Sequence, residues 1–228
     1  MVLRAKLLTE LAGSFAFMTV IALSGPAGSL APIAIGLGLA AMVYMGGHVS
    51  GAHYNPAVSF ALYLRRVLDL PTMLCYWAAQ AIGALLAFTA GYAISGHTPG
   101  IHPGAGVSSP AALGAEIIFT AALVLVILNV AATKATAGNS YYGLAIGFTV
   151  AAGAFAVGPI SGAAFNPAVG LGATAVAAVA GHGDWSHLWL YVVGPIAGAA
   201  IGAGLHVLQG PATTPVPPEK TERIPPQA

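Results

Sequence analysis

The chain carries the same tripeptide twice, as Asn55-Pro56-Ala57 and as Asn166-Pro167-Ala168. Each copy follows a Ser-Gly-Ala sequence at the same offset. Asn is a preferred N-cap, and Pro suits the first helical position, where its missing N–H would have no partner in any case. The Asn oxygen accepts from the first turn, so its NH2 group is left facing outward as a donor. With the positive end of a helix dipole behind it, each motif predicts a donor site that disfavours cations.

The composition does not suit a soluble globular domain. Of the 228 residues, 57% are hydrophobic and only 6% are charged, and the formal net charge is +1. This balance indicates a lipid bilayer as the surroundings and leaves no basic surface for nucleic acid. The single cysteine, Cys75, has no partner for an internal disulfide.

Six apolar stretches are long enough to cross the hydrocarbon core, which takes about 20 residues. They are residues 5–24, 31–47, 72–94, 111–132, 141–158 and 187–208. Two further apolar stretches are too short to span, and they follow the two Asn-Pro-Ala motifs, at 55–65 and 166–179. Short apolar segments at matching places in two halves indicate inverted repeats with a site at the midplane. We therefore predict an all-α membrane protein with six transmembrane helices and two re-entrant half-helices in an inverted 3+3 repeat.

The division of the chain follows from the same pattern. We expect one channel domain over residues 1–209, with a first repeat at about 4–95 and a second at about 110–208. Residues 210–228 are polar and rich in Pro, which predicts a disordered cytoplasmic tail.

The basic residues predict the orientation. With six spans, all of them fall on one side of the membrane: Arg4, Lys6, Arg65, Arg66, Lys134, Lys220 and Arg223. By the positive-inside rule this side is cytoplasmic. We expect a multi-pass protein of the plasma or inner membrane with both termini in the cytoplasm.

Two acidic residues, Glu10 and Glu116, lie inside the first and fourth predicted spans. An ionisable residue in a span is a functional hypothesis by default, and here it has two forms. One is a proton relay in a coupled transporter. The other, which we favour, is a buried acceptor for the backbone N–H groups of the re-entrant segments.

The histidines allow two interpretations as well. His53 precedes the first motif closely, and its protonation would be one way to gate a pore, although a structural role with satisfied hydrogen bonds is favoured. The spacing of the remaining histidines near the exterior loops does not match a metal site, so we predict surface residues at His97, His102, His182 and His187.

Several segments together resemble the aquaporin, or major intrinsic protein, family. They are HVSGAHYNPAV, ELAGSF with Glu10, and YWAAQAIGA, and the resemblance covers residues 4 to 208. It implies six spanning helices and two half-helices that meet at mid-membrane. It also implies a homotetramer with one pore per subunit, passive conduction of water or small uncharged solutes, and no cofactor.

Residues just before each Asn are candidates to line such a pore. Non-helical backbone at membrane depth is tolerated where it faces a water-filled cavity or is buried in protein. We expect carbonyl oxygens to face the pore from Gly51, Ala52, His53, Gly162, Ala163 and Ala164. Near the centre, Asn55 and Asn166 would supply donors, and the two helix ends would repel cations.

Counting along the family pattern places an outer selectivity filter at Ile35, Ala154, Ala163 and Val169. Many members have Arg where this chain has Val169, and water-selective members have an aromatic residue and a His at the first two positions. The resemblance therefore implies an apolar filter without Arg, and a pore for water and small neutral solutes such as glycerol, urea, ammonia or hydrogen peroxide. A strictly water-selective aquaporin is the alternative.

Other functional classes fit the sequence less well. An ion-coupled secondary transporter would also have inverted repeats, but it would normally need a coupling-ion site, and the spans offer only two acidic residues and no paired base. A membrane scaffold would close the pore with bulky residues, whereas Ala154 and Ala163 are small. An enzyme is not expected, because the sequence lacks a nucleophile–base pair, a metal cluster and a phosphate loop.

Overall fold

A computed structural model describes residues 2–210 of the chain, and all regular structure within that part is helical. The six predicted spans are confirmed: α1 (Leu3–Leu23), α2 (Ala31–Ser50), α4 (Leu70–Ser95), α5 (Ser109–Ile127), α6 (Tyr142–Ser161) and α8 (Leu188–Leu208). A π-helical turn, Leu128–Ala132, continues α5, and short 3-10 turns occupy Gly25–Leu30, Lys134–Thr136 and Trp185–His187. Of the predicted tail at 210–228, all but Gly210 lies outside the described residues.

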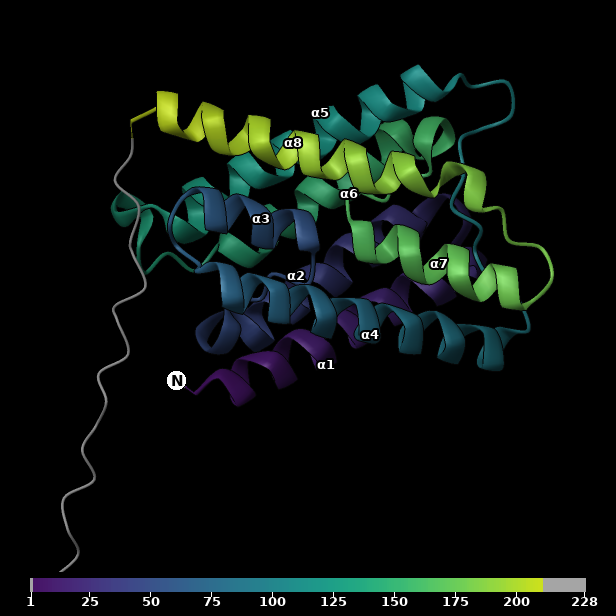
Figure 1. Cartoon of the computed structure of the whole chain (residues 1–228), viewed down its shortest axis with the longest axis horizontal. Coiled ribbons are helices and arrows are strands. Elements are labelled where there is room, and N and C mark those ends of the chain that lie inside the picture. The colour runs from purple at the N-terminus through teal and green to yellow at the C-terminus, as the bar shows by residue number, and fades with distance from the viewer. Residues whose placement is uncertain (1, 211–228) are drawn as a thin grey trace, which may run out of the picture.

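The two re-entrant half-helices are present as well. They are α3 (Pro56–Leu64) and α7 (Pro167–Val179), and each begins at the Pro of an Asn-Pro-Ala motif. In Figure 1 they lie in opposite halves of the bundle, α3 on the left and α7 on the right, with their starts toward the middle. The chain thus enters the bundle from both ends and turns back at its centre.

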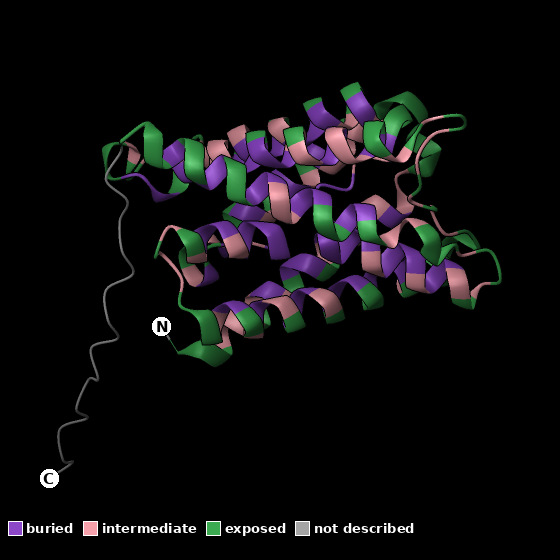
Figure 2. Ribbon diagram, turned by 45° about the horizontal axis from the view of Figure 1, so that its top comes forward, coloured by how far each residue is buried: buried purple, intermediate pink, exposed green. Residues whose placement is uncertain are grey.

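The two repeats interlock through these half-helices. Within the repeats, α1 packs on α2 and α4, and α5 packs on α6 and α8. Between the repeats, α2 packs on α6, while α3 packs on α8 and α7 on α4. Figure 2 shows buried residues gathered where helices face one another and on the half-helices, with exposed residues toward the outside. Each half-helix is therefore held by a span of the opposite repeat.

Glycine lets the repeats approach closely where α2 crosses α6. A Cβ atom built on Gly36 would lie 2.6 Å from the carbonyl oxygen of Gly147 and 2.7 Å from the Cβ of Ala151. A Cβ on Gly147 would in turn collide with the carbonyl oxygen of Gly36. Small residues at such a crossing allow backbone-to-backbone contact in a membrane.

This contact predicts that Gly36→Ala destabilises the fold. The new methyl group meets backbone, which cannot move aside, so we expect a loss of about 1–3 kcal/mol. The measurement is thermal unfolding in detergent. Gly114→Ala on α5 is the matched control, because no atom of another packed element lies within 4 Å of its Cβ position. Equal melting temperatures for the two variants would contradict the packing described.

Candidate functional site

Each Asn of the repeated motif caps its half-helix. The side-chain oxygen of Asn55 accepts the backbone N–H of Ala57 at 2.9 Å, and that of Asn166 accepts the N–H of Ala168 at 3.0 Å. Both Asn residues have extended backbone, as N-caps do. The capping predicted from the sequence is confirmed at both motifs.

The two caps are also joined to each other. The amide nitrogen of Asn55 donates to the carbonyl oxygen of Phe165 at 2.9 Å, and that of Asn166 donates to the carbonyl oxygen of Tyr54 at 2.9 Å. Both Asn side chains are buried, at 5% and 3% exposure. The expectation of an NH2 group that simply faces outward was therefore incomplete. One of its two N–H bonds ties the repeats together, and the other makes no hydrogen bond within residues 2–210.

The backbone before each Asn is strained in the same way in both repeats. Ala52 and Tyr54 have φ values of 52° and 49°, and Ala163 and Phe165 have 51° and 48°. These are left-handed conformations that non-glycine residues rarely adopt, and they persist only where the surroundings determine them. The matched strain indicates that both loops are shaped by the same set of contacts.

In the first repeat, those contacts come from Glu10. Its carboxylate accepts the backbone N–H groups of His53 at 2.9 Å and Tyr54 at 2.8 Å. It also accepts the Ser50 hydroxyl at 2.7 Å and the Gln80 amide at 2.8 Å. Bonds to a charged acceptor are stronger than neutral ones, so a buried carboxylate can compensate for strained backbone.

Glu116 occupies the same place in the second repeat. It accepts the backbone N–H groups of Ala164 at 3.1 Å and Phe165 at 2.7 Å, and the Ser161 hydroxyl at 2.7 Å. Both carboxylates have no exposed surface. The oxygens of both carboxylates accept hydrogen bonds from the re-entrant loops. Neither carboxylate is therefore free to pass a proton to another group, as a relay would require.

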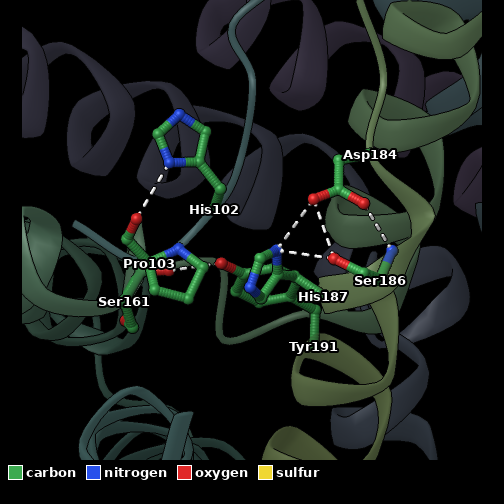
Figure 3. Close-up of polar contacts among 7 residues, drawn as sticks. All are labelled: His102, Pro103, Ser161, Asp184, Ser186, His187 and Tyr191. Carbon is green, nitrogen blue, oxygen red and sulfur yellow. Dashed lines mark hydrogen bonds and ion pairs between the residues drawn. The ribbon is translucent and has the colours of Figure 1, made fainter. Parts of the chain in front are cut away.

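Aromatic side chains that the sequence analysis did not single out complete the support. The hydroxyl of Tyr76 donates to the carbonyl oxygen of Ser50 at 2.8 Å, and that of Tyr191 donates to the carbonyl oxygen of Ser161 at 2.6 Å (Figure 3). The indole N–H of Trp77 donates to the carbonyl oxygen of Pro56 at 2.9 Å. The repeated Ser-Gly-Ala sequence could have indicated these contacts, because each Tyr hydroxyl donates to the carbonyl oxygen of its Ser.

A cavity of about 330 Å³ reaches the paired Asn residues from the end of the bundle where α1 begins and α5 ends. Four of the six residues predicted to present carbonyls line it, namely Gly51, Ala52, His53 and Ala164. Its mouth includes His48 and the segment 136–139 after α5, and much of its wall is apolar. A small molecule in this cavity would meet amide donors at its inner end.

The predicted filter residues lie elsewhere. Val169 is buried in the main apolar core, and Ile35 and Ala163 are half-buried against that core. Ala154 is half-buried on α6. All four are apolar and lie outside the lining of the cavity that holds Asn55. Gly162 also lies outside it, next to Ile101 and His102 of the loop before α5.

The opposite end of the bundle has a second cavity, of about 250 Å³, whose lining includes His102, His182, Asp184 and His187. Figure 3 shows Asp184 in contact with Ser186 and His187. Hydrogen bonds from Ser186 lower the pKa of the Asp184 carboxyl. Within residues 2–210, no three His, Cys, Asp or Glu side chains converge as metal ligands.

Comparison with known proteins gives consistent matches. The model of the family described as Major intrinsic protein matches residues 7–206. Aquaporin NIP1-1 of Oryza sativa subsp. japonica is 40% identical over 173 residues, which are 74% of this chain and 58% of that protein. Aquaporin-4 of Homo sapiens is 34% identical over 184 residues, 78% of this chain and 55% of that protein. The chain thus spans less than two thirds of the length of these relatives.

Among solved structures, the X-ray structure of the aquaglyceroporin from Plasmodium falciparum matches with a TM-score of 0.79. The match covers 90% of this chain and 96% of that chain, at 22% sequence identity. At this identity the likeness establishes the shared fold alone.

The carboxylate contacts predict that Glu116→Gln destabilises the protein. A Gln amide turns one of the acceptor oxygens into a donor, which then faces backbone N–H groups. We expect a loss of about 1–3 kcal/mol, the cost of leaving a buried donor without a partner. Thermal unfolding in detergent measures it, with the exposed carboxylate variant Asp184→Asn as control. A melting temperature for Glu116→Gln equal to that of the control would refute the role of Glu116.

Proposed function

Because the chain belongs to the major intrinsic protein family of membrane channels, we propose that it conducts water and small neutral solutes passively, with glycerol, urea, ammonia and hydrogen peroxide as the candidate solutes. The proposal is carried by one observation. A cavity with largely apolar walls ends at two buried amides, Asn55 and Asn166, each of which has one N–H bond left for a ligand.

The exclusion of ions follows from the same groups. A water molecule between the two amides accepts from both, so it is turned away from the orientation that would pass a proton along a file of waters. The starts of α3 and α7 meet at this point, and their dipoles place positive charge there. Neutral molecules that accept hydrogen bonds are favoured over sodium or hydronium ions.

The proposed outer filter, Ile35, Ala154, Ala163 and Val169, supports solutes beyond water. Its four side chains carry no charge and no hydrogen-bonding group. The side chains of such a filter do not bind water specifically, and they do not exclude a solute with a carbon skeleton. This is why we favour a mixed pore over a strictly water-selective one.

A coupled transporter has less support. Glu10 and Glu116, the two acids within the spans, are both used as acceptors by the re-entrant loops. An ion-coupling site would need an acid that is free to exchange its partner during transport.

For the molecule in its membrane we propose a homotetramer with one pore per subunit, in the plasma or inner membrane, with both termini cytoplasmic. The basic residues support this orientation. Those among the described residues lie where α1 begins and where α3 and α5 end: Arg4, Lys6, Arg65, Arg66 and Lys134.

Val169→Arg tests the filter. An Arg side chain in place of the buried Val169 would reach into the proposed outer filter and narrow it, so glycerol and urea permeability should fall relative to water by about tenfold or more. Stopped-flow light scattering on proteoliposomes measures the three permeabilities. Ala154→His, at a half-buried position, is a second variant, and it should also lower glycerol and urea permeability relative to water.

The control is Val179→Arg, which adds the same charge at the exposed end of the same helix, where the valine is 91% exposed. It should leave the solute-to-water ratios unchanged. Unchanged ratios in Val169→Arg and Ala154→His as well would mean that the filter lies at other residues.

A further inference from the structure

At the end of the bundle where α3 and α8 end, a histidine lies completely inside the protein. His206 is in the last turn of α8, and its side chain has no exposed surface. Its Nδ1 lies 3.1 Å from Nε of Arg65, which follows α3, and its Nε2 lies 3.0 Å from the hydroxyl oxygen of Thr133. In Figure 1 the ends of α3 and α8 are both in the left part of the bundle. The imidazole thus joins the first half-helix to the segment that follows α5.

The partners of His206 determine which of its nitrogens carries the proton. An Arg side chain only donates hydrogen bonds, so Nδ1 of His206 must accept from Nε of Arg65. Thr133 already donates its single hydroxyl proton to the carbonyl oxygen of Leu128 at 2.9 Å, so it accepts the N–H at Nε2. The ring is therefore neutral, and its lone pair is directed at Arg65.

This contact fixes the direction of the guanidinium group of Arg65. Nε is used by His206, whereas the two NH2 groups make no hydrogen bond within residues 2–210. Arg65 is half-buried, while Arg66 beside it is exposed. A planar guanidinium with a fixed direction and free N–H groups has the geometry that binds two oxygens of a phosphate or a carboxylate.

Carboxylates of the described residues do not supply these oxygens. Glu10 and Glu116 are held by the re-entrant loops, and Asp184 lies at the opposite end of the bundle. Asp69, the remaining acid, caps the start of α4. Within residues 2–210 no Lys or Arg forms an ion pair with a carboxylate. An anion that neutralises Arg65 would therefore come from outside this part of the chain.

Apolar side chains flank the guanidinium group on the outside of the bundle. Leu64 precedes Arg65 and is 41% exposed, while Val207 and Leu208 follow His206 and are 52% and 83% exposed. A cation beside exposed apolar side chains at the end of a span lies where phospholipid headgroups meet the acyl chains. These surroundings favour a lipid over a small soluble anion.

We propose that Arg65 binds the phosphate group of an anionic phospholipid, and that His206 is the positioning residue that directs the guanidinium group toward it. The NH2 groups of Arg65 donate to the two free oxygens of the phosphodiester. Arg66 and Lys134 are exposed nearby in the chain and favour a lipid of net negative charge over a zwitterionic one, whose ammonium group they repel. The inference requires a membrane protein, but neither a conducting pore nor a particular solute.

Lipid titration of the full-length protein, followed by native mass spectrometry, tests the site. We expect phosphatidylglycerol to bind more tightly than phosphatidylcholine with the same acyl chains. Arg65→Lys keeps the charge but loses the planar guanidinium and its bond to His206, so phosphatidylglycerol affinity should fall by about five- to tenfold. Arg66→Lys is the matched control and should change it by less than about twofold. Equal losses in the two variants, or no preference for phosphatidylglycerol, would overturn the proposal.

His206→Leu tests the positioning role, because it changes no charge when the ring is neutral. Phosphatidylglycerol affinity should fall about as far as in Arg65→Lys, while phosphatidylcholine affinity should stay the same. His206→Asn supplies an amide oxygen that can accept from Arg65, and it should restore most of the preference. A role in folding alone would lower the affinity for both lipids without recovery in His206→Asn, and that result would overturn the proposal.

Two other sources of the anion give different results in the same titration. Excess inorganic phosphate should not displace phosphatidylglycerol, because it lacks acyl chains, and displacement would assign the site to free phosphate. If the Arg65→Lys effect appears only after Glu219 and Glu222 are changed to Gln, those carboxylates occupy Arg65. Either result would overturn the proposal. Because binding is measured without transport, a protein that fails to conduct solutes would contradict the proposed function and leave the lipid site standing.

Discussion

Backbone that leaves a helix in the middle of a bilayer needs hydrogen-bond partners that the lipid does not supply. In this protein the partners are two buried carboxylates, Glu10 and Glu116, one for each re-entrant loop. They bind the N–H groups on one side of each loop and so leave the Asn side chains free to bind across the centre. The strained conformations before each Asn, the position of the half-helices and the floor of the cavity all depend on this arrangement.

Because of the reciprocal bonds between the Asn amides and the opposite loops, the two N–H bonds of each amide have different roles. One N–H of Asn55 holds the second repeat, and one N–H of Asn166 holds the first. The structural bond fixes the direction of the remaining N–H, so a molecule in the proposed pore would meet donors that do not need to reorganise. The same geometry therefore joins the halves and, in the proposed pore, would orient a molecule between them.

Much of this architecture was predictable from the sequence. Length and apolarity gave the six spans, and Asn before Pro gave the starts of α3 and α7, because these signals are local. The partner of each Asn could not be predicted, since the carbonyls of Tyr54 and Phe165 come into reach only when the two repeats are packed. Trp77 illustrates the same limit. Its apolar surroundings fit an interfacial position, and only the fold brings its N–H to the carbonyl of Pro56.

The central claim is that the tips of the two half-helices are bonded to each other at mid-membrane. A magic-angle-spinning NMR measurement of the dipolar coupling between the side-chain nitrogen of Asn55 and the carbonyl carbon of Phe165, in lipid bilayers, tests it most directly. The account predicts a measurable coupling, because the nitrogen lies 2.9 Å from the oxygen of that carbonyl and the carbon is at most ~1.2 Å farther away. The absence of a coupling, with both sites labelled and resolved, would contradict the structure on which the proposed pore rests.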